Sequence, residues 1–249
     1  MRRAALVVVG CLAACATSSP DSRPAIGAPR TEAIGRSSDG RAIEATTVGR
    51  GRCIYVIAGI HGDEPTGARL VDRLLVWLAE PGRLADTRVR VVHDLNPDGN
   101  ARGTRYNARA VDLNRNWPAA NFSAGPDRGE RPLSEPETQS VHVDIGRFEP
   151  ELLVVFHEAR GGPFVNFDGP AAAHAEAFAA AARSVDPRWR VVADMGYRTP
   201  GSLGSLFGVD GALPILTIEF PRGGSAEDAW PALQAGMQAL IRLGRQGRS

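Results

Sequence analysis

The segment 59–65 constrains this chain most, because it places His61 and Glu64 three residues apart at the end of an apolar run. Residues 53–60 predict a buried strand, and the apolar spacing over 65–79, which begins with proline, predicts a helix. A ligand pair at a strand-to-helix turn is how a catalytic zinc obtains two of its three protein ligands. The H-x-x-E pattern by itself is common, so the chain must also supply a third ligand and a base.

Composition narrows the class of protein. The 249 residues are 43% hydrophobic, which is enough to bury one sizeable core and is most simply one domain. The formal net charge of +1 argues against an electrostatic nucleic-acid binder. All the basic residues are arginines, which indicates coding bias, so an arginine cluster needs further support before it counts as a site.

The first residues predict a targeting segment. Two arginines precede an apolar run over 4–14 that is too short to anchor a helix across a bilayer. The run ends in Leu-Ala-Ala-Cys at Cys15, which resembles the lipobox of bacterial lipoproteins, where the cysteine is lipidated. Cleavage at Cys11 fits less well, and an ordinary secretory signal is the alternative.

These features predict a lipoprotein signal over 1–15, a flexible tether over 16–30 and a catalytic domain over 31–249. The alanine after Cys15 is compatible with delivery to the periplasmic face of the outer membrane, and secretion into the periplasm is the alternative. Cys53 would then be the only thiol in the mature chain, and we expect it to be a core residue.

Beyond residue 31 the chain alternates strand and helix patterns, which indicates an α/β fold with helices on both faces of one sheet and ligands at the strand ends. Ser134 and Glu137 form the pattern of a capping box. Residues 95–132 are a polar loop of a length that usually has a function. The expected strands are 42–48, 53–60, 88–93, 152–156 and 215–220, and the expected helices are 65–79, 134–146, 171–183 and 228–243.

The long loop carries Asn-Pro-Asp-Gly at 96–99 and the sequence GTRYNARAVDLNRNWP at 103–118. Together with the His61/Glu64 turn, residues 134–138, the strand before His157 and residues 217–220, these segments resemble the zinc carboxypeptidase family in the same order. The likeness covers about residues 42–220 and is greatest to the short bacterial branch, the murein peptide amidases. It implies a single-domain carboxypeptidase-like mixed sheet and one Zn²⁺ per chain.

The third zinc ligand is expected to be His157, which follows a strand and can reach the metal from there. His93 also lies at a strand end, but the family has no ligand at that position, and His142 and His174 lie in expected helices. Asp112 matches the carboxylate that orients the first zinc-binding histidine in the family. The alternative is a loop carboxylate in a turn.

Glu219 ends an apolar run and matches the general base of the family. Partial burial raises the pKa of such a carboxylate, and nearby zinc opposes this effect. The alternative is a strand-end glutamate paired with Arg222. Arg105 matches the arginine that stabilises the tetrahedral oxyanion.

Asn114 and Arg115 match the pair that binds the free carboxylate of a substrate, where a guanidinium makes two parallel charge-assisted hydrogen bonds. Tyr197 matches the mobile tyrosine that closes over the substrate, and a solvent-facing loop tyrosine is the alternative. Arg102 and Arg109 are interpreted as a solvated loop face and are left out of the site.

The resemblance implies a zinc-dependent peptidase or amidase that hydrolyses an amide bond next to a free carboxylate. The substrate would be a peptidoglycan-derived peptide, cut between γ-D-glutamate and diaminopimelate. The alternatives are a general metallocarboxypeptidase of envelope peptides and an inactive, lipid-anchored protein that binds peptidoglycan. Specificity residues are expected around 164–169 or 202–210. The chain lacks the nucleophile elbow of serine hydrolases and the H-E-x-x-H helix of thermolysin-like enzymes.

Overall fold

The computed structural model describes residues 28–84 and 86–246. The expected signal over 1–15, with Cys15, and most of the expected tether lie outside these residues. None of the helices within the described ranges is both long and apolar enough to cross a bilayer.

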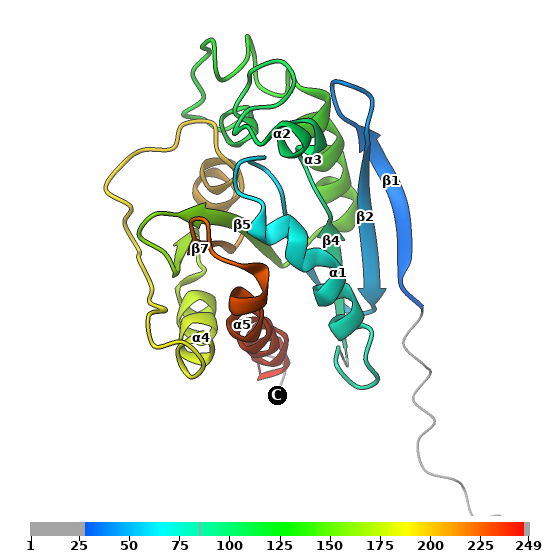
Figure 1. Ribbon diagram of the computed structural model, residues 1–249, viewed down its shortest axis with the longest axis vertical. Helices are drawn as coiled ribbons and strands as arrows, with labels where there is room; N and C mark the ends of the chain where they lie inside the picture. Colours follow the sequence, from blue (N-terminus) through cyan, green and yellow to red (C-terminus); the bar gives the residue numbers. More distant parts are fainter. Residues whose placement is uncertain (1–27, 85, 247–249) are drawn as a thin grey trace, which may run out of the picture.

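Within the described residues the strands form a seven-stranded sheet in the order β1-β2-β4-β3-β5-β7-β6 (Figure 1). The central strands β4, β3, β5 and β7 run parallel to one another, and antiparallel strands flank them on both sides. This is the expected mixed sheet. The strands are β1 (Arg30–Arg36), β2 (Ala42–Gly49), β3 (Arg52–Ile57), β4 (Thr87–Val92), β5 (Leu152–Ala159), β6 (Phe164–Asp168) and β7 (Ile215–Pro221).

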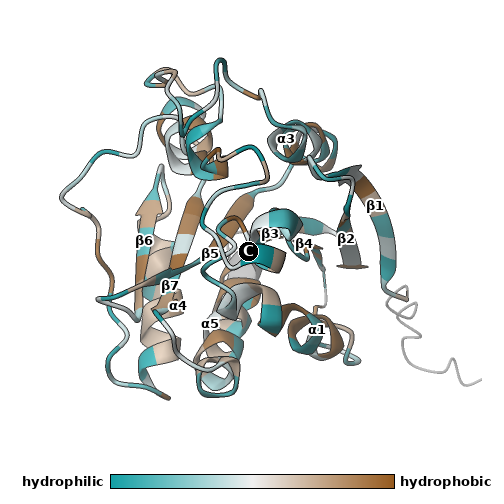
Figure 2. Cartoon of the chain, turned by 45° about the horizontal axis from the view of Figure 1, so that its top comes forward, coloured by the Kyte–Doolittle hydropathy of each residue, from teal (hydrophilic) through white to brown (hydrophobic). Residues whose placement is uncertain are grey.

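Helices cover both faces of the sheet, as expected for an α/β fold. α1, α4 and α5 pack on one face, and α3 and a π-helical turn pack on the other. Figure 2 shows hydrophobic residues along the central strands and hydrophilic residues on the surrounding loops. The helical segments are α1 (Thr66–Leu78), α2 (Pro97–Arg102), a 3₁₀ turn (Leu113–Arg115), α3 (Pro136–Phe148), α4 (Ala172–Arg183), the π-helical turn (Gly204–Asp210) and α5 (Ala226–Gln246).

Each face of the sheet buries its own hydrophobic cluster. Val56 and Phe156 belong to the cluster beneath α1, α4 and α5, whereas Ile57 and Val155 belong to the cluster beneath α3. This alternation follows from the period of two along a strand. Cys53 in β3 is buried, and burial raises the pKa of its thiol to about 12, which is the chemistry expected of a core cysteine.

Two strands of the structure were not predicted. β1 is an edge strand whose side chains are mostly exposed, so it lacks the apolar alternation that marks a strand in sequence. β6 is five residues long and carries Asn166 and Asp168, and its pairing with β7 is what defines it. The strand expected over 53–60 ends at Ile57, because Gly59 takes a φ of +68° and turns the chain.

The predicted capping box at Ser134 and Glu137 was wrong. α3 begins at Pro136 with Glu135 at the N-cap, and Ser134 donates its hydroxyl to Oε1 of Glu135 at 2.8 Å. Glu137 is buried and instead accepts the backbone N–H of Ser38 at 2.7 Å. Proline is favoured at the first helical position, so it sets the helix start one residue later than the capping pattern requires.

The topology creates a crevice beside β3. The chain passes from β3 through α1 to β4 on one side, whereas β5 pairs with β3 on the other side. Ligands of open α/β sheets bind where the connections diverge in this way, outside the carboxyl ends of the strands. His61 follows β3, and His157 lies near the end of β5.

Candidate active site

Three buried side chains, His61, Glu64 and His157, converge at this crevice. The Nδ1 atoms of His61 and His157 lie 3.0 and 2.9 Å from Oε2 of Glu64, and 3.2 Å from each other. A tetrahedral zinc ion bonded at about 2.0–2.1 Å holds its ligand atoms about 3.3 Å apart. Both the spacing and the donor set of two imidazoles and one carboxylate therefore fit a zinc ion.

The charges of this cluster depend on one another. Burial disfavours ionised Glu64, but hydrogen bonds from His157 and His61 hold its pKa far below the ordinary value. Burial also disfavours charged His61, yet hydrogen bonds to Asp112 and Glu64 leave the pKa of His61 raised. A proton therefore competes with a metal ion for His61, and metal affinity must fall as the pH falls.

Close backbone packing holds the turn that carries His61 and Glu64. A Cβ on Gly62 would overlap the backbone of Gly99 in α2, so only glycine allows this approach. Asn96 caps α2 by accepting the N–H of Gly99 at 2.9 Å, and its own backbone N–H donates to Gly59 at 2.9 Å. The Asn-Pro-Asp-Gly segment of the long loop thus supports the metal-binding turn.

Asp112 links three parts of the site. Its Oδ1 lies 3.1 Å from Nε2 of His61 and accepts the backbone N–H of Asn114 at 2.8 Å. Its Oδ2 accepts Nε–H of Arg105 at 3.0 Å. Burial would raise the pKa of Asp112, but the hydrogen bond from His61 and the nearby arginines hold it well below the ordinary value. Asp112 both stabilises a turn and lies where it can orient His61, so the two sequence interpretations are compatible.

Glu219 lies next to His157 across the parallel strands β7 and β5, in direct register. It is 8% exposed, and this burial raises the pKa of its carboxyl group, with the charge of His157 acting in the opposite direction. The alternative pairing with Arg222 is not formed. Arg222 instead contacts Asp63, and its Nη1 lies 3.4 Å from Oε1 of Glu64.

The three polar residues expected to hold substrate lie around the same cluster. Nη1 of Arg105 lies 3.2 Å from Oε1 of Glu64, and a third of its side chain is exposed. Asn114 is oriented by the N–H of Leu203, which donates to its Oδ1 at 3.1 Å. Arg115 is held by a 2.7 Å hydrogen bond from Nη1 to the carbonyl of Asn114.

A cavity of about 360 Å³ joins these groups. Tyr197 lines it with 61% of the residue exposed, and burial together with the charge of Glu219 raises the pKa of its phenol. Both segments expected to set specificity contribute to the lining: Asn166 and Asp168 come from β6, and residues 202–204 precede or open the π-helical turn.

Asp168 in β6 is another carboxylate that lines this cavity. Among the described residues its side-chain carboxylate has no ion-pair or hydrogen-bond partner, and burial raises its pKa. Gly204 and Gly208 pack directly against it, and a Cβ on either would overlap Asp168. The fold thus leaves space for a carboxylate that none of the described residues pairs with.

The alternative histidines lie outside the cluster. His93 shares a 2.7 Å hydrogen bond with Thr46 on the neighbouring strand β2. His142 in α3 packs beside the ring of Trp117, and His174 lies in α4. None of the three lines the cavity.

Sequence reasoning missed three charged residues that line the cavity: Glu158, Arg160 and Arg222. Glu158 accepts the backbone N–H groups of the α1 start and of the turn after β7, at 2.8 and 3.1 Å. The arginines were uninformative in a chain so rich in arginine. Only the pairing of β5 with β7 brings these residues to the site.

Comparison with known proteins identifies the family to which this chain is similar. The family described as zinc carboxypeptidase matches residues 27–202. Murein peptide amidase A from Escherichia coli (strain K12) is 36% identical over 203 residues, covering 75% of this chain and 78% of that protein. Murein peptide amidase A from Vibrio campbellii is 32% identical over 184 residues, covering 67% of this chain and 68% of that protein.

Solved structures show the same fold. The murein-tripeptide amidase from Escherichia coli O157 superposes with a TM-score of 0.68 at 31% identity, covering 85% of this chain and 91% of that chain. Bovine thrombin-activatable fibrinolysis inhibitor gives a TM-score of 0.71 at 16% identity, covering 88% and 90%, which is a likeness of fold alone.

Proposed function

The chain belongs to the zinc carboxypeptidase family and is a hydrolase, and we propose that it cleaves the γ-D-glutamyl–diaminopimelate bond of peptidoglycan-derived peptides. The observation that carries this proposal is the composition of one cavity. It joins the metal cluster, the buried Glu219, an arginine–asparagine pair and the unpartnered Asp168. The similarity to murein peptide amidases supports the choice of substrate.

The residues around the metal cluster have separate roles in amide hydrolysis. Zinc, when bound by His61, Glu64 and His157, supplies a Lewis acid that polarises the amide carbonyl and makes water more acidic. Glu219 accepts a proton from the attacking water and passes it to the leaving amine. Arg105 donates hydrogen bonds to the negative charge that develops on the carbonyl oxygen.

The leaving residue would be held by Asn114, Arg115 and Asp168. Asn114 and Arg115 can donate hydrogen bonds to its free carboxylate. Asp168 can pair with a cationic group at the end of the leaving residue's side chain, because no described residue forms an ion pair with this carboxylate. Diaminopimelate has a free carboxylate next to the scissile amide and a side chain whose last carbon bears an ammonium group together with a second carboxylate.

The test is mass spectrometry of products from defined peptides. The zinc-loaded enzyme should release free diaminopimelate from L-Ala-γ-D-Glu-diaminopimelate. Glu219→Gln should bind zinc and release none, because the amide cannot accept the proton. Turnover by this variant at the normal rate would contradict the mechanism.

A general metallocarboxypeptidase is the second candidate, and the similarity to murein peptide amidases does not favour it. Rapid release of C-terminal residues from ordinary L-peptides, with no diaminopimelate release, would support it. An inactive peptidoglycan-binding protein is opposed by the presence of the complete ligand set and of Glu219.

The proposed location is the periplasmic face of the outer membrane, through a lipid on Cys15, with secretion into the periplasm as the alternative. The two arginines and the short apolar run before Cys15 support it. Labelled palmitate should be incorporated into the protein in cells and should be absent from Cys15→Ser. Equal labelling of both proteins would reject lipidation at Cys15.

A further inference from the structure

Two guanidinium groups in the cavity have no role in the mechanism above. Arg160 and Arg222 both line the cavity that contains the metal cluster and Glu219. Arg160 forms no ion pair or hydrogen bond within residues 28–84 and 86–246. A cation that lines a cavity and forms no contact with a protein anion is available to an anionic ligand.

The backbone holds these two arginines together. In the register of β5 and β7, Ala159 pairs with Pro221, and the two arginines directly follow the ends of these strands. The N–H of Arg222 donates to the carbonyl of Ala159 at 3.0 Å. The same strand pair carries His157 and the base, so both arginines lie at the reacting end of the sheet.

The Arg222 side chain is fixed but keeps donors free. Its Nη2 pairs with Asp63, and its Nη1 lies 3.4 Å from Oε1 of Glu64. A guanidinium has five N–H donors, so most of them remain for a ligand. Since 34% of the side chain is exposed, such a ligand can reach it.

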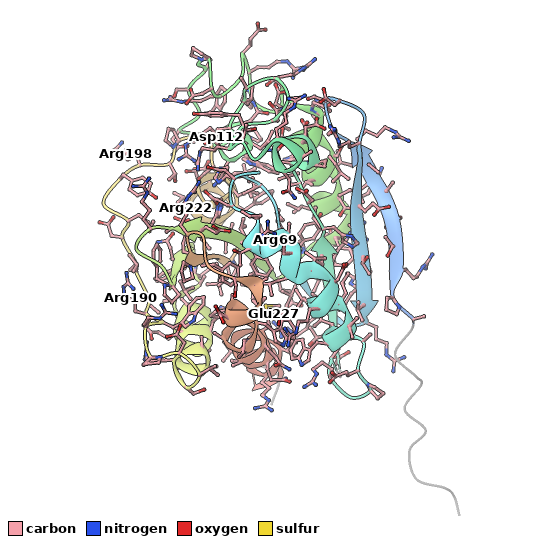
Figure 3. The ribbon with its side chains drawn as sticks, viewed as in Figure 1. Arg69, Asp112, Arg190, Arg198, Arg222 and Glu227 are labelled. Carbon is pink, nitrogen blue, oxygen red and sulfur yellow. The ribbon has the colours of Figure 1, made fainter. Side chains whose placement is uncertain are left out.

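Arg222 has different acidic neighbours from Arg115, the arginine assigned above to the leaving residue. The charges of Asp63 and Glu64 act on Arg222, whereas those of Asp112 and Tyr197 act on Arg115. Figure 3 shows Asp112 nearer the top of the view and Arg222 below it. Since Arg115 is assigned to the leaving residue, Arg222 remains available in the same cavity for the acyl side of the scissile bond.

The acyl residue of a γ-linked substrate carries an anion that an ordinary peptide lacks. In γ-D-glutamate the scissile carbonyl belongs to the side chain, so the α-carboxylate is free. Four carbon–carbon bonds of about 1.5 Å separate the two carboxyl carbons, which places them about 5 Å apart when extended. An α-linked peptide has an uncharged amide in this region.

We propose that Arg222 and Arg160 bind the free α-carboxylate of the γ-glutamyl residue and so select γ-linked over α-linked substrates. This inference rests on the proposed function and identifies its acyl-side recognition. Arginine suits this task because its planar fork donates two parallel hydrogen bonds to a carboxylate.

The experiment compares two tripeptides that differ only in this carboxylate. One is L-Ala-γ-D-Glu-diaminopimelate, and in the other the α-carboxylate of the D-glutamyl residue is converted to the amide. The wild-type kcat/KM should favour the free acid by about 10–100-fold, the size of a charge-assisted hydrogen bond. In Arg222→Gln this ratio should fall toward 1, and in Arg160→Gln it should fall less.

Two controls separate recognition from structural damage. Arg69→Gln removes an exposed arginine on α1 that does not line the cavity, so the ratio should stay at the wild-type value. Zinc content is measured for every variant, because Arg222 contacts Glu64. Arg160 has no partner to lose, so Arg160→Gln tests the inference even if Arg222→Gln fails to fold.

A wild-type ratio near 1 would overturn the inference, as would a loss in Arg222→Gln that is equal for both tripeptides at full zinc content. These outcomes leave the proposed function intact, because diaminopimelate is still released. Failure of the wild-type enzyme to cleave either tripeptide would instead remove the proposed function, and this inference with it.

Discussion

Replacement of Asp112 by alanine should weaken zinc binding and slow the chemical step together, because this one carboxylate holds three groups. It accepts hydrogen bonds from His61 at 3.1 Å, from Arg105 at 3.0 Å and from the backbone of Asn114 at 2.8 Å. Loss of a carboxylate that orients a metal-binding histidine costs about 10–100-fold in metal affinity. This loss of affinity corresponds to about 1.4–2.7 kcal/mol of zinc-binding free energy.

The catalytic effect follows from the contact with Arg105. Without Asp112 its guanidinium keeps only the contact with Glu64, so its donors are no longer aimed at the developing oxyanion. Removing one such donor costs about 10²–10³ in kcat. We therefore expect a loss of this size at saturating zinc.

Asp112→Asn separates the two effects. The amide oxygen can still accept hydrogen bonds from His61 and from the backbone of Asn114, but its NH₂ group would face the Nε–H of Arg105. This variant should keep more of the zinc affinity than the alanine variant while losing a similar share of kcat. Asn also remains a good cap for the 3₁₀ turn.

The assays are a zinc titration against a chromophoric chelator and kcat measured at saturating zinc. Asp72→Asn is the matched control, because Asp72 is an exposed carboxylate on α1 away from the cavity. Wild-type zinc affinity in Asp112→Ala would refute the role of Asp112 at His61. A normal kcat in both Asp112 variants would refute its role in placing Arg105.

Three other predictions follow from the geometry. In the metal-free protein the pKa of the Glu219 carboxyl group should lie above 4.5 because of burial, and bound zinc should lower this pKa. ¹³C NMR of labelled glutamate, with the signal assigned by its loss in Glu219→Gln, measures the pKa with and without zinc. Gly62→Ala should lower the unfolding free energy by about 1–3 kcal/mol and weaken zinc binding, because the added Cβ overlaps the Gly99 backbone. Gly146→Ala is the control and should not destabilise the protein, because the space around Gly146 is open. Asp168→Asn should lower kcat/KM about 10-fold for a diaminopimelate terminus but not for a neutral one; equal losses on both would argue against an ammonium partner.

Local sequence patterns were sufficient to predict many of the strands and helices of this protein. The apolar run before His61 and the proline after Glu64 predict a strand and a helix, and α1 follows that turn as expected. The order of the segments predicted the family, and that assignment is confirmed. The parts that failed are those in which a partner elsewhere in the chain decides the structure, such as the edge strand β1 and the start of α3.

Residue identity and spacing alone determined which groups are available to the site: two histidines, a carboxylate pair and the loop that carries Asp112. Tertiary structure decided which of them meet. The register of β5 with β7 pairs segments about 60 residues apart, and it sets His157 beside Glu219 and brings Arg160 near Arg222. β6 then places Asp168 in the cavity by pairing with β7. No local period encodes such pairings, because the free energy that selects them comes from burying both faces of the completed sheet.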